Sequence, residues 1–209
     1  MARSPCDLCG GTKHRYCEAK AAWVPCECLR GKRSTVRYRR AGIPERFDGE
    51  TWASFLSSHE VSRPRALVEA AKVLSEGCQP AGWILIHGRP TRARALAVAL
   101  LLRSACDGRL EARALDVPSL IDAEFTPGRG RKVYETDVLA VEVGGEPKNK
   151  WNRHVLEKAL RDRWSRGQFT ILVTEGDPSR LAAGYGSGVI EESLSEKFSK
   201  VRVAPKEGS

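Results

Sequence analysis

Apolar and polar positions alternate along the chain in two periods, which separate short buried strands from helices. Short apolar runs bounded by glycine or polar residues predict strands that are buried on both faces. Such runs occupy residues 82–88, 112–117, 137–145 (with Glu142 at the strand's end), 169–174 and 200–203. Apolar residues at helical spacing predict helices before and between these strands. These helices are expected over residues 64–76, 93–105, 118–125 and 149–166.

The alternation of strands and helices predicts an α/β domain with a parallel sheet that helices cover on both faces. Residues 93–105 are apolar nearly all round, as expected of a buried helix. Residues 126–131 are expected to form a loop, and residues 45–62 to be irregular. The irregular segment is expected to dock onto the domain through Phe47, Trp52 and Phe55. The inner face of the helix at 149–166 is expected to consist of Val155, Leu156, Ala159, Leu160 and Trp164.

The first predicted strand, its glycine-containing loop and the buried helix together make the arrangement of a P-loop. A working P-loop has the sequence G-x-x-x-x-G-K-[ST]. Its backbone N–H groups hold phosphates, and its lysine contacts the β- and γ-phosphates. The hydroxyl group of its final serine or threonine holds magnesium. Aligned on Gly88, this chain keeps Thr91 but has Ala93 for the second glycine, Arg94 for the lysine and Ala95 for the hydroxyl. Arg94 keeps the charge in a planar group, whereas Ala95 cannot bind a metal. The pattern predicts a P-loop-like fold whose nucleotide chemistry is damaged.

Five of the seven cysteines lie between positions 6 and 28, and their spacing indicates a metal site. Cys6 and Cys9 are separated by two residues and precede two glycines, while Cys26 and Cys28 are separated by one residue. Four thiolates in this pattern form a closed, tetrahedral structural zinc site, which stabilises a segment too small to fold alone. We therefore predict that Cys6, Cys9, Cys26 and Cys28 bind one structural zinc ion.

Two further residues leave the ligand set open. Cys17 and His14 lie between the two cysteine pairs, where a hairpin tip is expected, and either could replace one of the four ligands. Five unrelated thiols are the remaining alternative. Cys78 and Cys106 stand apart at the edges of apolar segments and are expected to be small buried hydrophobic residues.

Positive charge is concentrated at the amino-terminal end. The formal net charge is +9, of which residues 1–44 carry +7 and residues 45–209 carry +2. This division suggests a zinc-binding head with a basic helix over 1–44, followed by the P-loop-like domain over 45–209. An anionic partner, nucleic acid first, is expected for the helix at 29–41, although a solvated segment that aids solubility is the alternative. Its candidate binding residues are Arg30, Lys32, Arg33, Arg37, Arg39 and Arg40.

The sequence also bears on the compartment. It has no run of 18 apolar residues, and its amino-terminal end lacks the apolar stretch of a secretory signal. A cytoplasmic protein without a membrane partner is therefore expected.

The chain resembles the helicase loaders of the DnaC/DnaI type and the related IstB transposition helpers, which are AAA+ ATPases. The resemblance covers nearly all of the chain and rests on the cysteine spacing, the Ala41-Gly-Ile-Pro-Glu-Arg-Phe47 segment and residues 82–105. It implies an AAA+-like domain, a replicative helicase held by the amino-terminal region, and contact with single-stranded DNA.

The resemblance also implies catalytic positions, and each of them is altered in this chain. Glu142 and Val143 stand where the family has two carboxylates, so Glu142 could still reach a metal but Val143 cannot act as a base. Glu175 stands at a position that is normally asparagine, and Ser193 stands at the arginine finger, whose loss alone costs about 10³–10⁵ in rate. A pseudo-ATPase without catalytic residues is expected, and ATP is not expected to be required. The degenerate nucleotide site would consist of Gly88, Thr91, Arg94 and Glu142.

These observations favour a non-hydrolysing, helicase-loader-like adaptor in DNA replication that engages a replicative helicase, single-stranded DNA or both. One alternative is a zinc-dependent nucleic-acid-binding module, in which the head and its basic helix are the active parts. The other is an atypical AAA+ ATPase.

The ligand assignment makes a prediction about metal content. Serine at Cys6, Cys9, Cys26 or Cys28 should unfold the head and release the zinc, because each substitution removes one of four ligands. Cys17→Ser should do neither. The measurement is the amount of zinc per mole of each purified variant. A Cys17→Ser protein that loses its metal would contradict the ligand assignment.

Overall fold

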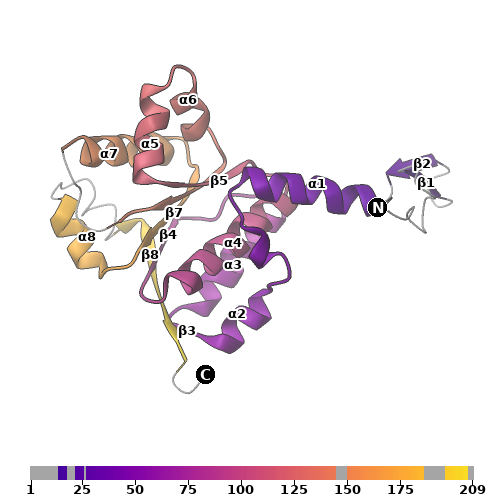
Figure 1. Ribbon diagram of the computed structural model, residues 1–209, viewed down its shortest axis with the longest axis horizontal. Coiled ribbons are helices and arrows are strands. Elements are labelled where there is room, and N and C mark those ends of the chain that lie inside the picture. The colour runs from indigo at the N-terminus through magenta and orange to yellow at the C-terminus, as the bar shows by residue number, and fades with distance from the viewer. Residues whose placement is uncertain (1–13, 18–21, 26, 145–149, 186–195, 207–209) are drawn as a thin grey trace.

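The computed structural model describes residues 14–17, 22–25, 27–144, 150–185 and 196–206. Side chains are described for residues 34–128, 132–144, 151–181 and 196–206. A two-stranded hairpin, β1 (His14–Cys17) and β2 (Ala22–Pro25), precedes helix α1 (Glu27–Arg40). Figure 1 shows this hairpin at one end of α1, away from the α/β body.

The body is built around a six-stranded sheet with the order β3-β8-β4-β7-β6-β5. All neighbouring strands are parallel except β3 and β8, which pair antiparallel. The sheet is therefore mostly parallel, and its antiparallel edge departs from the fully parallel sheet that the sequence predicts. The strands are β3 (His59–Val61), β4 (Trp83–His87), β5 (Ala112–Asp116), β6 (Val138–Glu142), β7 (Phe169–Thr174) and β8 (Phe198–Pro205).

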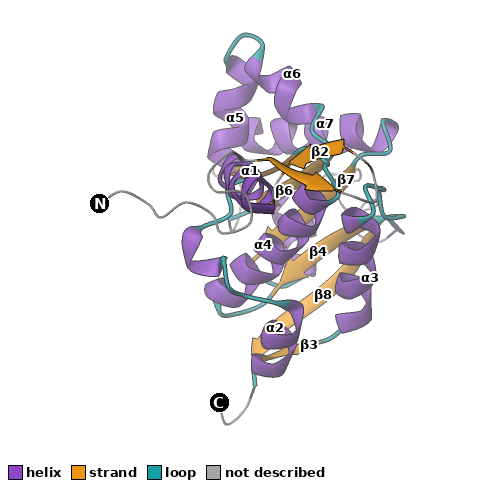
Figure 2. Ribbon diagram, turned by 90° about the vertical axis from the view of Figure 1, so that its right-hand side faces the viewer, coloured by secondary structure: helices purple, strands orange, loops and turns teal. Residues whose placement is uncertain are grey.

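Helices cover both faces of this sheet, as predicted. Helices α1 to α4 lie on one side and α5 to α8 on the other (Figure 1), and α3 and α4 lie across β4 and β8 (Figure 2). On the first face, α2 (Trp52–Ser58) and α3 (Pro64–Ser75) accompany α4 (Thr91–Asp107). The second face carries α5 (Val117–Phe125), α6 (Arg129–Tyr134), α7 (Lys150–Ser165) and α8 (Pro178–Tyr185). No helix in the described part of the chain is long and apolar enough to cross a membrane.

Helix α4 is buried on nearly every side, as its apolar sequence predicts. Residues 96–102 of this helix are all buried, because α4 packs between the sheet and helices α1, α2 and α3. Phe47 and Phe55 are fully buried and Trp52 packs against the same core, so the predicted docking of these aromatic residues is confirmed.

Residues 45–62 are not irregular as predicted. They form a 3-10 turn at Glu45–Phe47, then α2 and β3. Helix α2 begins at a capping box, in which Thr51 and Ser54 exchange side-chain to backbone hydrogen bonds. Such short elements contain too few residues to display a helical or strand period, and β3 is defined by its backbone pairing with β8.

Three further predictions are wrong. Residues 126–131 are not all loop, since α6 begins at Arg129 after a turn at Gly128. The glycine and arginine residues at the start of this helix show no apolar period from which a helix could be predicted. Trp164 is 44% exposed, because its ring meets Trp83 only edge to face while Lys197 lies 4.5 Å above it. Cys78 is exposed, whereas Cys106 is buried as expected and burial raises its pKa to about 11.

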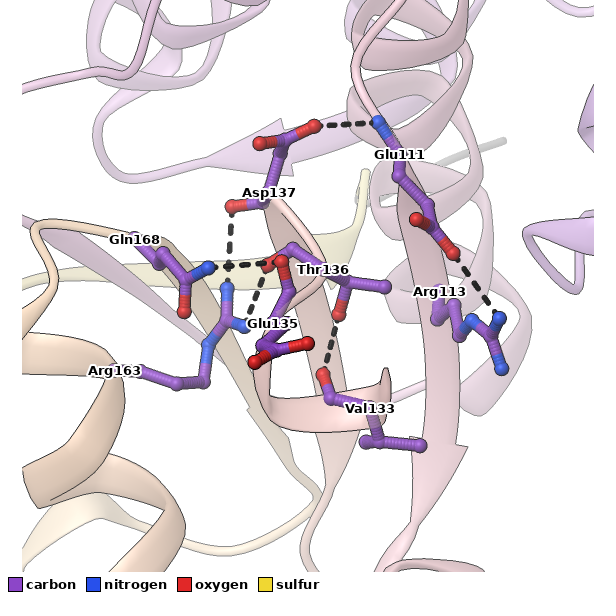
Figure 3. Close-up of polar contacts among 8 residues, drawn as sticks. All are labelled: Glu111, Arg113, Val133, Glu135, Thr136, Asp137, Arg163 and Gln168. Carbon is purple, nitrogen blue, oxygen red and sulfur yellow. Dashed lines mark hydrogen bonds and ion pairs between the residues drawn. The ribbon is translucent and has the colours of Figure 1, made fainter. Parts of the chain in front are cut away.

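A buried arginine on α7 joins the amino ends of the neighbouring strands β6 and β7 (Figure 3). The Arg163 guanidinium donates hydrogen bonds to the carbonyls of Thr136 (2.7 Å), Asp137 (3.2 Å) and Phe169 (2.6 Å). It also donates to the Tyr134 carbonyl at 3.3 Å and, through Nε, to the Thr170 hydroxyl at 2.9 Å. Burial lowers its pKa to about 9, which still leaves the group charged at neutral pH.

Arg163→Met should therefore destabilise the domain strongly. Methionine fills the volume of the stem but leaves the carbonyl oxygens without donors, and each such orphan costs about 1–3 kcal/mol. We expect the free energy of unfolding in urea to fall by about 3–5 kcal/mol. Arg161→Met, on an exposed position of the same helix, should change it by no more than about 0.5 kcal/mol. Equal effects of the two substitutions would contradict the role of the buried contacts.

Candidate functional site

The junction between β4 and α4 occupies the position of a P-loop, but the helix begins early. Strand β4 ends at His87 and α4 already begins at Thr91, so Gly88, Arg89 and Pro90 are the whole connection. The N–H groups of Ala93 and Arg94 both donate to the Pro90 carbonyl, at 3.1 and 3.4 Å. In a working P-loop these positions belong to a loop whose N–H groups face the phosphates. Here two of those donors are used inside the chain.

Gly88, the retained glycine of the motif, is required by packing. Its φ is +113°, and a Cβ at this position would collide with the carbonyl oxygen of Val203 on β8. Only glycine tolerates both the backbone conformation and the close approach. The contact with β8 therefore accounts for Gly88 without any phosphate.

Arg94, which stands at the position of the P-loop lysine, is buried and turned back onto its own loop. Its exposed fraction is 2%. One terminal nitrogen donates to the Gly88 carbonyl, and the other lies 3.3 Å from the Thr91 hydroxyl and 3.9 Å from the Glu142 carboxylate. The structure thus brings together the four residues of the predicted nucleotide site, Gly88, Thr91, Arg94 and Glu142. Arg94 contacts each of the other three residues and so links them.

A second ion pair crosses the same edge of the sheet. Arg89 Nε lies 2.8 Å from the Glu175 carboxylate, immediately beyond β7. Neither partner is buried, so the pair contributes little to stability. The ion pair matters because of where it lies. It joins Arg89, in the loop that aligns with a P-loop, to Glu175, the residue that the resemblance places near a γ-phosphate. Sequence reasoning missed Arg89, although an arginine in the loop and a glutamate in place of asparagine are matching signals.

The remaining catalytic positions differ in their surroundings. Glu142 ends β6 with 56% of its side chain exposed, as expected for a residue at the strand's end. Val143 follows it and is 1% exposed, with its N–H bonded to the Val173 carbonyl at 2.7 Å. It therefore packs in the core behind the site. Ser193 lies outside the described residues.

A cavity of about 350 Å³ lies beside this junction. The segment 42–44, the inner face of α4 and the ends of β5 and β6 enclose it. Its lining is mostly apolar, and its polar contributions come from Thr91, Arg94, Asp116, Ser119 and Glu142. Asp116 caps α5 by accepting from the Ser119 N–H at 2.8 Å, and hydrogen bonds from the side chain and then the backbone of Ser119 lower the pKa of its carboxyl group.

The carboxyl-terminal part of the basic helix α1 is docked onto the body. The Tyr38 hydroxyl donates to Asp107 on α4 at 2.6 Å, and burial together with this bond raises the pKa of Tyr38 to about 12. Arg37 donates to the Cys106 carbonyl at 3.3 Å, while Arg39 donates to the Ile43 carbonyl and to Asp48, each at 2.6 Å.

Two of the six predicted basic binding residues thus use their side chains internally, while Arg40 is exposed and the side chains of Arg30, Lys32 and Arg33 are not described. Ala41 and Ile43 are also buried in the core of the body, so the segment that leads out of α1 packs with the α/β domain.

The predicted zinc ligands fall largely outside the described residues. This holds for Cys6, Cys9 and Cys26, and Cys28 is described only as part of the first turn of α1. Within the described residues no group of three or more metal-ligating side chains is found. The hairpin register does separate the two alternative ligands. Cys17 pairs with Ala22 at the closed end, whereas His14 pairs with Pro25 at the open end, next to position 26.

Comparisons with known proteins place the fold. No protein-family model matches the sequence, and no curated protein matches it. Three crystal structures are similar over most of the chain. The DnaC helicase loader is 20% identical with a TM-score of 0.60, over 77% of this chain and 99% of that one. DnaI is 12% identical with a TM-score of 0.64, over 82% and 100% of the two chains.

The third structure is a putative primosome component from Streptococcus pyogenes serotype M3. It is 13% identical with a TM-score of 0.61, over 83% of this chain and 98% of that one. At these identities the likeness establishes the fold alone, which is that of the DnaC and DnaI structures. The fold expected from the resemblance is therefore confirmed for the α/β body.

The packing role of Gly88 can be separated from a phosphate role by one substitution. Gly88→Ala should lower the free energy of unfolding by more than about 2 kcal/mol without any nucleotide present, because the methyl group meets the Val203 carbonyl and φ is positive. Gly49→Ala is the matched control, since nothing lies within 4 Å of its added Cβ. Urea unfolding measures both. A Gly88→Ala protein as stable as the wild type would contradict the packing role and favour a role of this glycine in phosphate binding.

Proposed function

We propose that this protein is a helicase-loader-like adaptor in DNA replication that does not hydrolyse ATP. The observation that carries the proposal is the β4–α4 junction. In a fold shared with DnaC and DnaI over almost the whole of those chains, the position of the P-loop lysine is taken by a buried arginine that bonds to its own loop.

The contacts of Arg94 support the absence of hydrolysis. A catalytic P-loop cation must lie against the transferring phosphate, and a hydroxyl beside it must hold magnesium. Arg94 is directed to the Gly88 carbonyl and Thr91, and the next residue is Ala95, which offers no oxygen. Val143, at the position of the water-activating carboxylate, is apolar and buried. ATP would thus meet neither the hydroxyl that holds magnesium in a working P-loop nor the base that hydrolysis needs.

The partner assignment follows the fold and the charge. DnaC is named a helicase loader, and we propose that this chain likewise engages a replicative helicase. The head, residues 1–44, carries +7 of the net charge, and we propose that a zinc ion held by its cysteines folds it into the docking part. The docked end of α1 would then fix the direction in which the head leaves the body.

The proposal predicts no ATP turnover above background in the presence of magnesium. Phosphate release from the purified protein measures this directly. The matched variant is Arg94→Ala, which should leave the background rate unchanged. ATP hydrolysis that disappears in Arg94→Ala would overturn the proposal and favour an atypical AAA+ ATPase.

Helicase engagement is tested by capture of the cognate replicative helicase. The full chain should retain it, and removal of residues 1–26 should abolish retention, because the shortened chain keeps the contact of Tyr38 with Asp107 but loses Cys6, Cys9 and Cys26, three of the four proposed zinc ligands. Circular dichroism shows whether the body stays folded. Capture that survives this removal would place the helicase surface on the body, and absence of capture by the full chain would refute the loader-like role.

A further inference from the structure

The cavity beside the β4–α4 junction is lined by residues at which this chain departs from a working P-loop. Arg94 and Ala95, which replace the lysine and the hydroxyl residue, line it from α4, and Glu142 lines it from the end of β6. The cavity lies at the carboxyl ends of parallel strands, where open α/β sheets bind their ligands. Its volume of about 350 Å³ falls within the range of small-molecule sites. The departures therefore leave a cavity but change what it can hold.

Most of the cavity wall is apolar and comes from three parts of the chain. Val98 and Leu102 line it from α4, Ile43 and Pro44 from the segment after α1, and Ala114 from β5. These side chains offer no hydrogen bond to a phosphate or to a sugar hydroxyl. A polar group placed against them would lose its water without gaining a partner. The wall therefore favours a ligand with an apolar body over the polar body of a nucleotide.

Two carboxylates supply most of the charge that an entering molecule meets. Asp116 and Glu142 are register partners on the parallel strands β5 and β6, and such partners lie about 4.8 Å apart on the same face of a sheet. Both line the cavity and both are exposed. Hydrogen bonds from Ser119 lower the pKa of the Asp116 carboxyl group, so this group is ionised at neutral pH. Arg94 is the only cation among the described residues of the lining, but its side chain is 3% exposed and already bonded to the Gly88 carbonyl.

We propose that this cavity binds a small organic amine, with its ammonium group between Asp116 and Glu142 and its apolar body against α4. An ammonium group supplies three donors and a charge opposite to that of the two carboxylates. A metal ion is a poorer occupant, because two carboxylates provide too few oxygen ligands and the apolar wall would stay uncovered. Both carboxylates would repel a phosphate or another anion. The inference rests on that part of the proposed function in which this site does not use ATP.

Three probes with the same phenyl body and different head groups test the assignment. They are phenethylamine, 2-phenylethanol and 3-phenylpropanoate, which are cationic, neutral and anionic at neutral pH. Titration of the ¹⁵N-labelled full chain, followed by ¹H–¹⁵N correlation spectra, gives both the affinity and the place of binding. Phenethylamine should bind at least about tenfold more tightly than 2-phenylethanol, because a charge-assisted hydrogen bond is stronger than a neutral one, and 3-phenylpropanoate should bind most weakly. The amide signals of Ala95, Val98 and Ser119 should shift.

Substitutions in the lining separate this cavity from other sites. Asp116→Asn keeps the cap of α5 and Glu142→Gln keeps the shape of the side chain, yet each removes a charge. Each should weaken phenethylamine binding by about ten- to one-hundredfold. Ala95→Leu should weaken binding of all three probes, because the larger side chain occupies the cavity. Glu111→Gln removes an exposed carboxylate next to the amino end of β5, outside the lining, and should leave binding unchanged. Circular dichroism establishes that each variant is folded.

The proposal is overturned if 2-phenylethanol binds as tightly as phenethylamine, or if neither carboxylate substitution weakens binding. It is also overturned if the shifted signals lie outside the cavity or if no probe binds. Phosphate release from ATP in the same samples distinguishes this inference from the proposed function. Absence of amine binding in a protein that does not hydrolyse ATP would refute this inference alone, whereas hydrolysis of ATP that also displaces phenethylamine would refute both.

Discussion

Two buried guanidinium groups hold the ends of the central strands, and the sheet depends on the acceptors that they find there. A buried cation costs several kcal/mol unless oxygen atoms replace its water. At the amino ends of β6 and β7, Arg163 bonds to four backbone carbonyls and the Thr170 hydroxyl. At the carboxyl edge, Arg94 bonds to the Gly88 carbonyl and Thr91 and approaches Glu142. Backbone carbonyls at the strand ends thus accept from both arginines, and these bonds help to fix how those ends lie.

The same requirement for oxygen partners is met by Arg94, which the sequence aligns with the lysine of a P-loop. The planar fork of arginine can bond to a backbone carbonyl and to a hydroxyl at once, which the compact ammonium of lysine does less well. An entering phosphate would have to draw Arg94 away from Gly88 and Arg89 away from Glu175. The binding free energy would then be only the difference between the bonds of these arginines to phosphate oxygens and their present bonds within the chain. The carboxylates of Glu142 and Glu175 would also repel the charge of the phosphate. A phosphate that bound at this position would therefore have to replace two internal pairs.

Much of the α/β body could be predicted from the sequence, because short apolar runs and apolar residues at helical spacing both indicate burial. Strands β4 to β7 and helix α4 lie within a few residues of their predicted bounds. Helix α2, strand β3 and helix α6 were missed, since a capping box, backbone pairing and a glycine turn define them. The substitutions at the P-loop could be read residue by residue. The inward direction of Arg94 and the role of Arg163 could not, because both depend on carbonyls that only the fold brings together.

The distribution of charge gives the molecule two basic regions with different surroundings. Helix α1, which belongs to the head, is bonded through its last turn to α4 on one face of the sheet, while α5 to α7 lie on the opposite face (Figure 1). Helices α5 to α7 carry +4 although residues 45–209 carry only +2, so the rest of the body is slightly acidic. At physiological salt, exposed charges interact over only about 8 Å. The charges of one basic region therefore have little influence on an anion near the other. An anion held at α5 to α7 and one held by residues 1–44 would therefore not compete for the same surface.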